Sequence, residues 1–183
     1  MIIAVIPAKG HSRRLKNKNI RKINKKNLIE YSIDYAKKSK LIKQIYISTD
    51  TKKIINSIKD YKIKTIIRPK KLGGETPIID VYRHAYKKVK NLKINLVIGL
   101  QPDHPDRSKD IDKLIRKFIK KKYSHSVSYN INTRNKDGSY YLMSKKHILK
   151  SDYSKPMKVY DDCTNIHNFK DLKFAEKKMK NEK

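Results

Sequence analysis

The chain opens with an apolar run, residues 2–8, that passes directly into a loop rich in cationic and amide side chains, residues 9–19. A run of β-branched residues without polar alternation is typical of a strand covered on both faces. Gly10 lets the chain turn sharply after this strand, because a residue without Cβ tolerates positive φ. At the carboxyl end of a buried strand, such a loop offers N–H groups and positive charge to a polyphosphate. It is not a Walker A loop, because the second glycine and the Gly-Lys-Ser/Thr ending are missing.

Length and composition indicate one ordinary domain over residues 1–183, which is long enough to bury a full core. No apolar run approaches the ~18 residues needed to span a bilayer, so we expect no membrane segment. No basic segment precedes the first strand, so we expect no signal peptide. The single cysteine, Cys163, cannot form an internal disulfide, which favours a cytoplasmic location.

The formal net charge of +30 raises the alternative of a nucleic-acid-binding protein. The excess is mostly lysine, however, and it is spread along the whole chain beside abundant isoleucine and asparagine. These three residues share A/T-rich codons, so we favour genome composition as the cause and expect no nucleic-acid partner. The charge still attracts anions such as nucleotides over long distances.

Apolar and amphipathic segments alternate along the chain, and this alternation predicts an α/β fold with a three-layer, mostly parallel sheet. The expected strands are residues 2–7, 45–48, 64–67, 95–100, 126–129 and 139–143. The expected helices are residues 27–40, 51–60, 77–90, 108–121 and 168–180. The spacing of the tyrosines predicts core packing at positions 31, 35, 82, 86, 140 and 141.

Polar clusters follow four of the predicted strands, at residues 9–19, 48–50, 68–69 and 101–107. Ligands of open α/β sheets bind at the carboxyl ends of the strands. Four such clusters at equivalent strand ends therefore indicate one binding site more strongly than any cluster alone. The alternatives are a solvated basic loop at residues 13–18 and simple helix capping by Asp50, or by His104 and Asp106 near a helix starting at Ser108.

The ordered motifs resemble the acylneuraminate cytidylyltransferase family, which contains CMP-sialic acid synthetases and relatives for other acidic sugars. The residues that carry the resemblance are 6–13, 18–19, 47–50, 68–72 with Glu75, 100–107, 137–142 and 165–176. The resemblance implies a Rossmann-like sheet of the nucleotide-diphospho-sugar transferase type. It also implies a reaction in which the hydroxyl of a small 2-keto-3-deoxy acidic sugar attacks the α-phosphate of CTP, with Mg²⁺, giving CMP-sugar and pyrophosphate.

The resemblance also implies roles for individual residues. Expected to bind nucleotide are Ala8, Lys9, Gly10, Ser12, Arg13, Lys18, Asn19, Arg68 and Gln101. Lys9 stands where the family has arginine, so its contact lacks the bidentate guanidinium fork. Arg13, Lys18 and Asp103 are the expected catalytic residues, and Gln101 and Asp137 are expected to contact the acceptor sugar.

The sequence departs from the family at the metal site, where two aspartates are replaced by Asn165 and His167. Neither is a strong ligand for Mg²⁺, which prefers charged oxygen. Asp103 stands where the family has threonine, and related Kdo cytidylyltransferases place a metal-binding aspartate at a similar strand end. We therefore predict that Asp103 supplies the main carboxylate, with His167 or Asp161 and Asp162 nearby.

A second departure is the short connection from residue 129 to residue 137, where the family has a long dimerisation segment. A homodimer is therefore expected to lack the usual contact. Three alternatives stay open beside the leading function: a nucleotidyltransferase with another acceptor such as a sugar phosphate or phosphonate, a nucleotide-binding protein without catalysis, and a nucleic-acid-binding protein. Cys163 lacks a recognisable base partner, so we do not expect nucleophilic catalysis.

Overall fold

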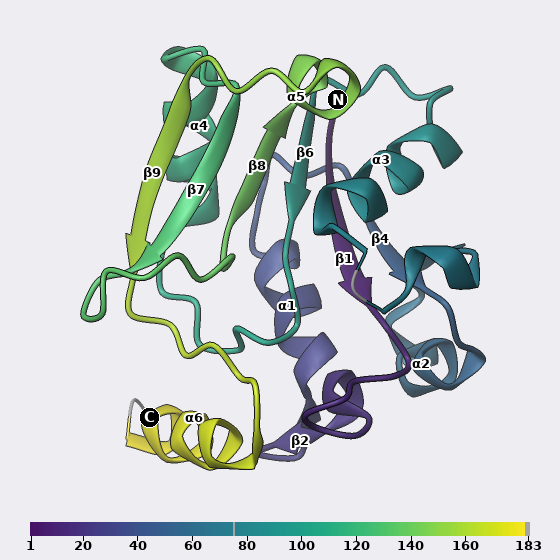
Figure 1. Cartoon of the computed structure of the whole chain (residues 1–183), viewed down its shortest axis with the longest axis vertical. Coiled ribbons are helices and arrows are strands. Elements are labelled where there is room, and N and C mark those ends of the chain that lie inside the picture. The colour runs from purple at the N-terminus through teal and green to yellow at the C-terminus, as the bar shows by residue number, and fades with distance from the viewer. Residues whose placement is uncertain (75, 182–183) are drawn as a thin grey trace.

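A computed structural model describes residues 1–74 and 76–181. The chain forms one seven-stranded sheet with the spatial order β5-β4-β1-β6-β8-β7-β9, and a two-stranded hairpin, β2-β3, lies outside it (Figure 1). The strands are β1 (Ile2–Ala8), β2 (Lys22–Ile23), β3 (Lys26–Asn27), β4 (Gln44–Thr49), β5 (Lys64–Ile67), β6 (Leu96–Gly99), β7 (His125–Asn130), β8 (Tyr141–Ser144) and β9 (Pro156–Asp161). The helices are α1 (Leu28–Lys37), α2 (Lys52–Ser57), α3 (Ile78–Lys88), α4 (Ile111–Lys120), α5 (Lys145–Lys150) and α6 (Phe169–Asn181), with short 3-10 turns at Lys18–Ile20, Lys59–Tyr61 and Lys70–Leu72.

The predicted mostly parallel sheet is confirmed. Strand β1 pairs in parallel with both β4 and β6, and β4 pairs in parallel with β5. Strand β8 is antiparallel to both of its neighbours, β6 and β7, whereas β7 and β9 are parallel. Because β1 is central, its residues alternate between two cores: Ala4 and Ile6 face α1, α2 and α4, whereas Ile3 and Val5 face α3 and α5. No helix in the described part of the chain has the length and apolarity needed to cross a bilayer.

The prediction missed the hairpin β2-β3, the helix α5 and the edge strand β9. The start predicted for α4 was wrong. The helix begins at Ile111, and its N-cap is Asp110, whose side chain accepts a hydrogen bond from the Lys113 N–H. Ser108 instead donates its hydroxyl to Asp161 at 2.6 Å.

Four of the six tyrosines predicted to pack in the core are buried, and two are half-buried. Tyr35, Tyr82, Tyr86 and Tyr140 are buried in the two main cores, and Tyr141 is half-buried at the margin of the second. Tyr31 is half-buried against a third core. A third, smaller core lies under the carboxyl ends of the strands, where α6 packs against the hairpin and the first loop (Figure 1). Its buried members are Leu15, Ile23, Leu28, Ile166, Leu172 and Ala175. This core fixes the C-terminal segment beside the loop that follows β1.

Candidate active site

Two adjoining cavities lie at the carboxyl ends of β1, β5 and β6. The first, about 200 Å³, is lined by most of the predicted nucleotide-binding residues, namely Lys9, Ser12, Lys18, Asn19, Arg68 and Gln101. Asp103, the predicted metal-binding carboxylate, lines the same cavity. The second, about 810 Å³, shares Lys9, Ser12 and Lys18 with the first and adds Arg13 and His167. The strand ends thus bring together residues that are widely separated in the sequence, as expected for a ligand site in an open α/β sheet.

Two buried donors in the first cavity lack hydrogen-bond partners among the described residues. They are the hydroxyl of Ser12 and the Nε of Arg68, a residue only 5% exposed. Burial lowers the pKa of the Arg68 guanidinium, and the nearby Asp50 carboxylate opposes this effect. A buried, unsatisfied donor costs about 1–3 kcal/mol, and more when it is charged. Both groups are therefore suited to an anionic ligand that accepts their hydrogen bonds.

The loop after β1 is held by its own backbone and by Asp50. The Gly10 N–H donates to Asp50 Oδ1 at 2.7 Å, and Asn19 Nδ2 donates to the Lys9 carbonyl at 2.8 Å. The conformational reason given for Gly10 was wrong, because the described glycines with positive φ are Gly74 and Gly138. A Cβ at Gly10 would instead lie 2.7 Å from Thr51 Cγ2, so close packing excludes a side chain.

Two further nucleotide-binding predictions are changed by this geometry. The Ala8 side chain is buried in the core, so only its backbone is available to a ligand. The Gly10 N–H is already bonded to Asp50 rather than open to a phosphate. Asp50 is not the helix cap, since Thr51 is the N-cap of α2.

Lys18 and Asp103 join three separate segments at one point. Lys18 Nζ lies 2.6 Å from Asp103 Oδ2 and 3.0 Å from the Ile166 carbonyl. The Ile166 N–H in turn donates to the Asp103 carbonyl at 2.9 Å. Burial is the largest single effect on the Asp103 carboxyl and raises its pKa, but the charges of Lys18 and His104 together with the hydrogen bonds to the carboxylate outweigh it, and the pKa lies below its usual value. Asp103 is therefore ionised at neutral pH and connects the β6 loop to the cationic loop and the C-terminal segment.

Gln101 and Asp137, the residues predicted to contact the acceptor, make polar contacts with the segment that precedes β8. Gln101 Nε2 lies 3.3 Å from the Tyr141 hydroxyl and 3.5 Å from the Gly138 carbonyl. Asp137 Oδ1 accepts from the N–H and the hydroxyl of Ser139, whereas its Oδ2 is buried without a partner in the described residues. Asn165 Oδ1 has the same status, and Asn165 Nδ2 donates to the Asp137 carbonyl at 3.2 Å. Gln101, Asp137 and Asn165 thus form a polar region beside Asp103.

The donor set agrees with the way proteins bind Mg²⁺, through one or two carboxylates with substrate phosphates and water. Asp103 is the carboxylate that lies between the cationic loop and Gln101. Burial and the charges of Arg14 and Lys18 lower the pKa of the His167 imidazole, so this ring is neutral near pH 7. The described residues contain no group of three or more histidine, cysteine or acidic side chains placed to hold a metal ion.

The prediction that Asp161 or Asp162 lies in this metal site was wrong. Asp161 is 1% exposed, and its carboxylate accepts hydrogen bonds from Ser108 and from the Tyr140 hydroxyl, outside both cavities. The Oδ2 atom of Asp162 lies 3.2 Å from the Nζ atom of Lys178 in α6. The capping role considered for Asp106 was also wrong, because its carboxylate accepts from Thr164 and pairs with Lys178. These groups anchor the C-terminal segment. Glu75, part of the predicted motif, lies outside the described residues.

Arg107 is a positioning residue that the sequence interpretation did not single out. The residue is 9% exposed, and its guanidinium donates to the carbonyls of Gln101 at 2.6 Å, His104 at 2.6 Å and Ser139 at 2.8 Å. One planar group therefore ties the β6 loop to the segment before β8. Its location within the motif at residues 100–107 was the available signal, but a buried arginine bonded to carbonyls cannot be recognised from sequence spacing.

The parallel sheet with a cationic loop after its first strand is the arrangement of an α/β nucleotide-binding protein. A family model described as cytidylyltransferase matches residues 3–183. The chain therefore belongs to the cytidylyltransferase family, which confirms the family predicted from the motifs.

Named relatives agree with this assignment, and solved structures share the fold. A CMP-N,N'-diacetyllegionaminic acid synthase of Campylobacter jejuni is 52% identical over 60 residues, which cover 33% of this chain and 26% of that protein. A CMP-2-keto-3-deoxy-manno-octonic acid synthetase determined with CTP covers 100% of this chain and 99% of its own, with a TM-score of 0.81 and 14% identity. The Mycobacterium tuberculosis protein Rv0371c, determined with manganese, covers 96% and 98%, with a TM-score of 0.67 and 9% identity. The sequence match to the Campylobacter relative thus spans about a quarter of that protein's length, and the two solved structures support the fold.

Proposed function

We propose that this chain transfers CMP from CTP to an acidic 2-keto-3-deoxy sugar and releases pyrophosphate. The observation that carries the proposal is the pair of buried, unsatisfied donors, Ser12 Oγ and Arg68 Nε, in the cavity that also contains Lys18 and Asp103. A nucleotide phosphate or base oxygen placed there would satisfy both donors. The relatives' names supply the acidic-sugar class, since those proteins make CMP-activated sugar acids.

The residues divide the work of an in-line attack on a triphosphate, which depends on positioning and on neutralising charge. Ser12, Arg13 and Lys18 would hold the phosphate oxygens in the cationic cavities. Gln101 and Asp137 would orient the acceptor hydroxyl from the opposite side, using the amide group and the free Oδ2.

Asp103 would hold a divalent cation together with the phosphates, and His167 lies at the edge of the same region. Such a cation supplies further neutralisation of phosphate charge when it is bound. For Asp103 to take this role, its contact with Lys18 must loosen, which frees the Lys18 ammonium for a phosphate oxygen. We propose that residues 1–183 act in this way as a single nucleotidyltransferase domain of the cytoplasm.

The test is a panel of CTP, UTP and ATP with Mg²⁺ and several sugar acids and sugar phosphates, with release of pyrophosphate as the readout. We expect release with CTP and a 2-keto-3-deoxy sugar acid, and its loss in EDTA. Arg68→Ala should lower turnover at least about 100-fold, since it removes a charged donor from the reacting anion. Lys64→Ala, which removes an exposed charge from β5, the strand that directly precedes Arg68, is the matched control. Release that requires a sugar phosphate instead would replace the acceptor proposed here.

A second candidate, nucleotide binding without turnover, is favoured by one observation: the carboxylate expected to hold the metal, Asp103, is paired with Lys18. It predicts that CTP raises the melting temperature by ligand linkage while no acceptor yields pyrophosphate.

A further inference from the structure

One side of helix α6 combines exposed aromatic rings with exposed cations. Phe169 and Phe174 are 55% and 63% exposed. The exposed lysines on the same side of the helix are Lys170, Lys173, Lys177 and Lys180. At 3.6 residues per turn, these six side chains fall within less than half of the helix circumference. They form one surface, which we name the α6 outer face.

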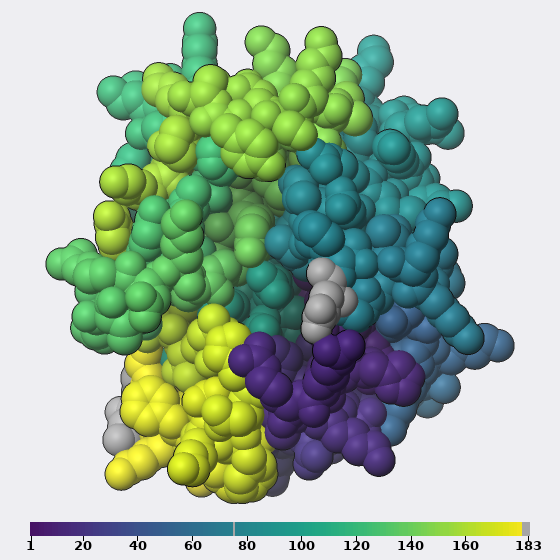
Figure 2. Space-filling model, viewed as in Figure 1, coloured from purple at the N-terminus to yellow at the C-terminus, as the bar shows by residue number. Residues whose placement is uncertain are grey.

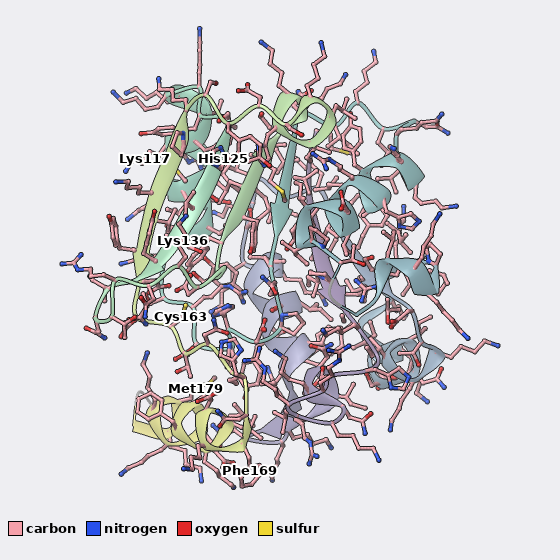
Figure 3. All side chains as sticks on the ribbon, viewed as in Figure 1. Lys117, His125, Lys136, Cys163, Phe169 and Met179 are labelled. Atoms are coloured by element: carbon pink, nitrogen blue, oxygen red, sulfur yellow. The ribbon has the colours of Figure 1, made fainter. Side chains whose placement is uncertain are left out.

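The packing of α6 against the protein uses the opposite side of the helix. Leu172 and Ala175 are buried in the third core, and Met179 packs against it. Figure 3 shows Met179 on the side of α6 toward the sheet and Phe169 at the outer rim. In Figure 2 the yellow atoms of α6 lie at the lower rim of the molecule, next to the purple atoms of the first loop. The third core is therefore complete without the two phenylalanines, which remain largely in water.

The charge of the α6 outer face is positive, because both acidic residues of the helix are engaged locally. Asp171 accepts hydrogen bonds from two backbone N–H groups that precede the helix, and Glu176 lies 3.0 Å from Lys173. The hairpin β2-β3, which packs beside α6, adds the exposed cations Lys22 and Lys25 at the same end of the molecule (Figure 1). This end of the protein therefore attracts an anionic surface.

Phenylalanine and lysine side by side on one helix face are typical of a helix that lies in the interface between lipid and water. A phenyl ring has no hydrogen-bonding group, so it gains free energy when it leaves water for the boundary of the acyl chains. A lysine can place its methylene stem at that boundary while its ammonium reaches the lipid phosphates. The phosphates of a nucleic acid would also match the lysines, but a duplex offers no apolar layer to the two rings.

We propose that the α6 outer face docks this protein onto an anionic membrane surface, with Phe169 and Phe174 entering the boundary between headgroups and acyl chains. The helix would lie on the bilayer rather than cross it. The inference is independent of the function proposed above, since no residue of the α6 outer face lines either cavity. Lys178 of α6 pairs with Asp106 at 3.0 Å, and Lys18 bonds the carbonyl of Ile166 shortly before the helix. Docking would therefore hold the candidate active site close to the membrane.

The experiment measures sedimentation of the protein with sucrose-loaded vesicles of phosphatidylcholine, with or without about 30% phosphatidylglycerol, at about 0.15 M salt to screen diffuse attraction. We expect binding to the anionic vesicles to be at least about tenfold tighter than binding to the neutral ones. The double variant Phe169→Ser/Phe174→Ser keeps every charge and should weaken binding to the anionic vesicles at least about tenfold. Ile119→Ser is the matched control, because Ile119 is 53% exposed on the basic helix α4.

A second pair of variants separates the α6 outer face from the net charge of the whole protein. Lys170→Gln/Lys177→Gln removes two charges from the α6 outer face, and Lys117→Gln/Lys120→Gln removes two exposed charges from α4. We expect the α6 pair to weaken vesicle binding at least about fivefold more than the α4 pair. All the replaced side chains are exposed, so each variant should keep the melting temperature of the unsubstituted protein to within a few degrees.

Four outcomes would overturn the inference. The first is no sedimentation with anionic vesicles, or equal sedimentation with neutral ones. The second is unchanged binding of Phe169→Ser/Phe174→Ser, and the third is equal losses in the α4 and α6 charge variants, because binding would then follow net charge alone. The fourth is a single-stranded oligonucleotide that displaces the vesicles and itself binds Phe169→Ser/Phe174→Ser more weakly, which would assign the α6 outer face to nucleic acid.

Discussion

Replacing Lys18 by methionine tests the junction on which both the fold and the proposed chemistry depend. The two charges lie 2.6 Å apart, and both side chains are only 14% exposed. At an effective dielectric constant of about 20, their attraction is about 6 kcal/mol before desolvation is subtracted. Removing one partner of a buried pair costs about 3–5 kcal/mol, because the other charge stays buried and unpaired. We expect Lys18→Met to lower the free energy of unfolding by about 3 kcal/mol at pH 7.

The pH dependence of this loss gives the sharper check. In the unsubstituted protein Asp103 has a pKa below its usual value, so its contribution is present above the unfolded-state pKa and is lost as pH falls through the folded-state pKa. In Lys18→Met the charge and the hydrogen bond of Lys18 are lost while the burial of Asp103 remains, so the pKa of its carboxyl rises. The carboxyl then protonates at a higher pH, so the cost of the substitution shrinks as pH falls from 7 toward 4.

The assay is urea unfolding of four proteins: unsubstituted, Lys18→Met, Asp103→Asn and the double variant. Asp103→Asn keeps the shape and leaves Lys18 its bond to the Ile166 carbonyl, so it should cost less, about 1–2 kcal/mol. The double variant should be about 2 kcal/mol more stable than the sum of the single changes predicts. Additive losses, or a Lys18→Met loss that does not vary with pH, would refute the reasoning. Asp103→Asn should also abolish Mg²⁺-dependent turnover, and full activity would remove Asp103 from the metal site.

Three further predictions concern the surroundings of the site. Gly99→Ala should destabilise the protein by about 2–3 kcal/mol in urea unfolding, because the new Cβ would lie 2.3 Å from Tyr82 Cζ. His104 is 1% exposed, and burial lowers its pKa to about 4, so its contribution to stability is present above the unfolded-state pKa of about 6.5 and is lost as pH falls toward 4. His104→Leu should therefore flatten the stability profile between pH 6.5 and 4, and a profile as steep as before would contradict this. Arg107→Lys should lower the free energy of unfolding by about 2–3 kcal/mol, since three carbonyls lose one shared planar donor. Because Gln101 is then less firmly placed, the acceptor KM should rise more than the CTP KM. Equal changes in both KM values would count against a positioning role.

Local patterns in the sequence were sufficient for much of the fold. The buried run before Ala8 and the apolar strand near Val97 were predicted within one or two residues at each end, because a doubly covered strand has a continuous apolar signature. The edge strand β9 carried a usable signal as well, since Met157 and Val159 alternate with exposed residues. One face of β9 is exposed, so its apolar residues alternate with polar ones. This pattern is a weaker sign of a strand than the continuous apolar run of a doubly covered strand.

The sequence by itself determined which chemistry is available: a cationic loop after the first strand and polar residues after three others, because strand ends of one direction share one edge of the sheet. The tertiary structure decided how those groups pair. Lys18 meets Asp103 across 85 residues of sequence, and Arg107 turns inward to bond Ser139, 32 residues away. Strand β8 runs antiparallel between β6 and β7, and His125 of β7 stacks on His147 of α5, 22 residues later in the chain. Such contacts depend on packing between distant segments, for which spacing along the chain carries no periodic signal.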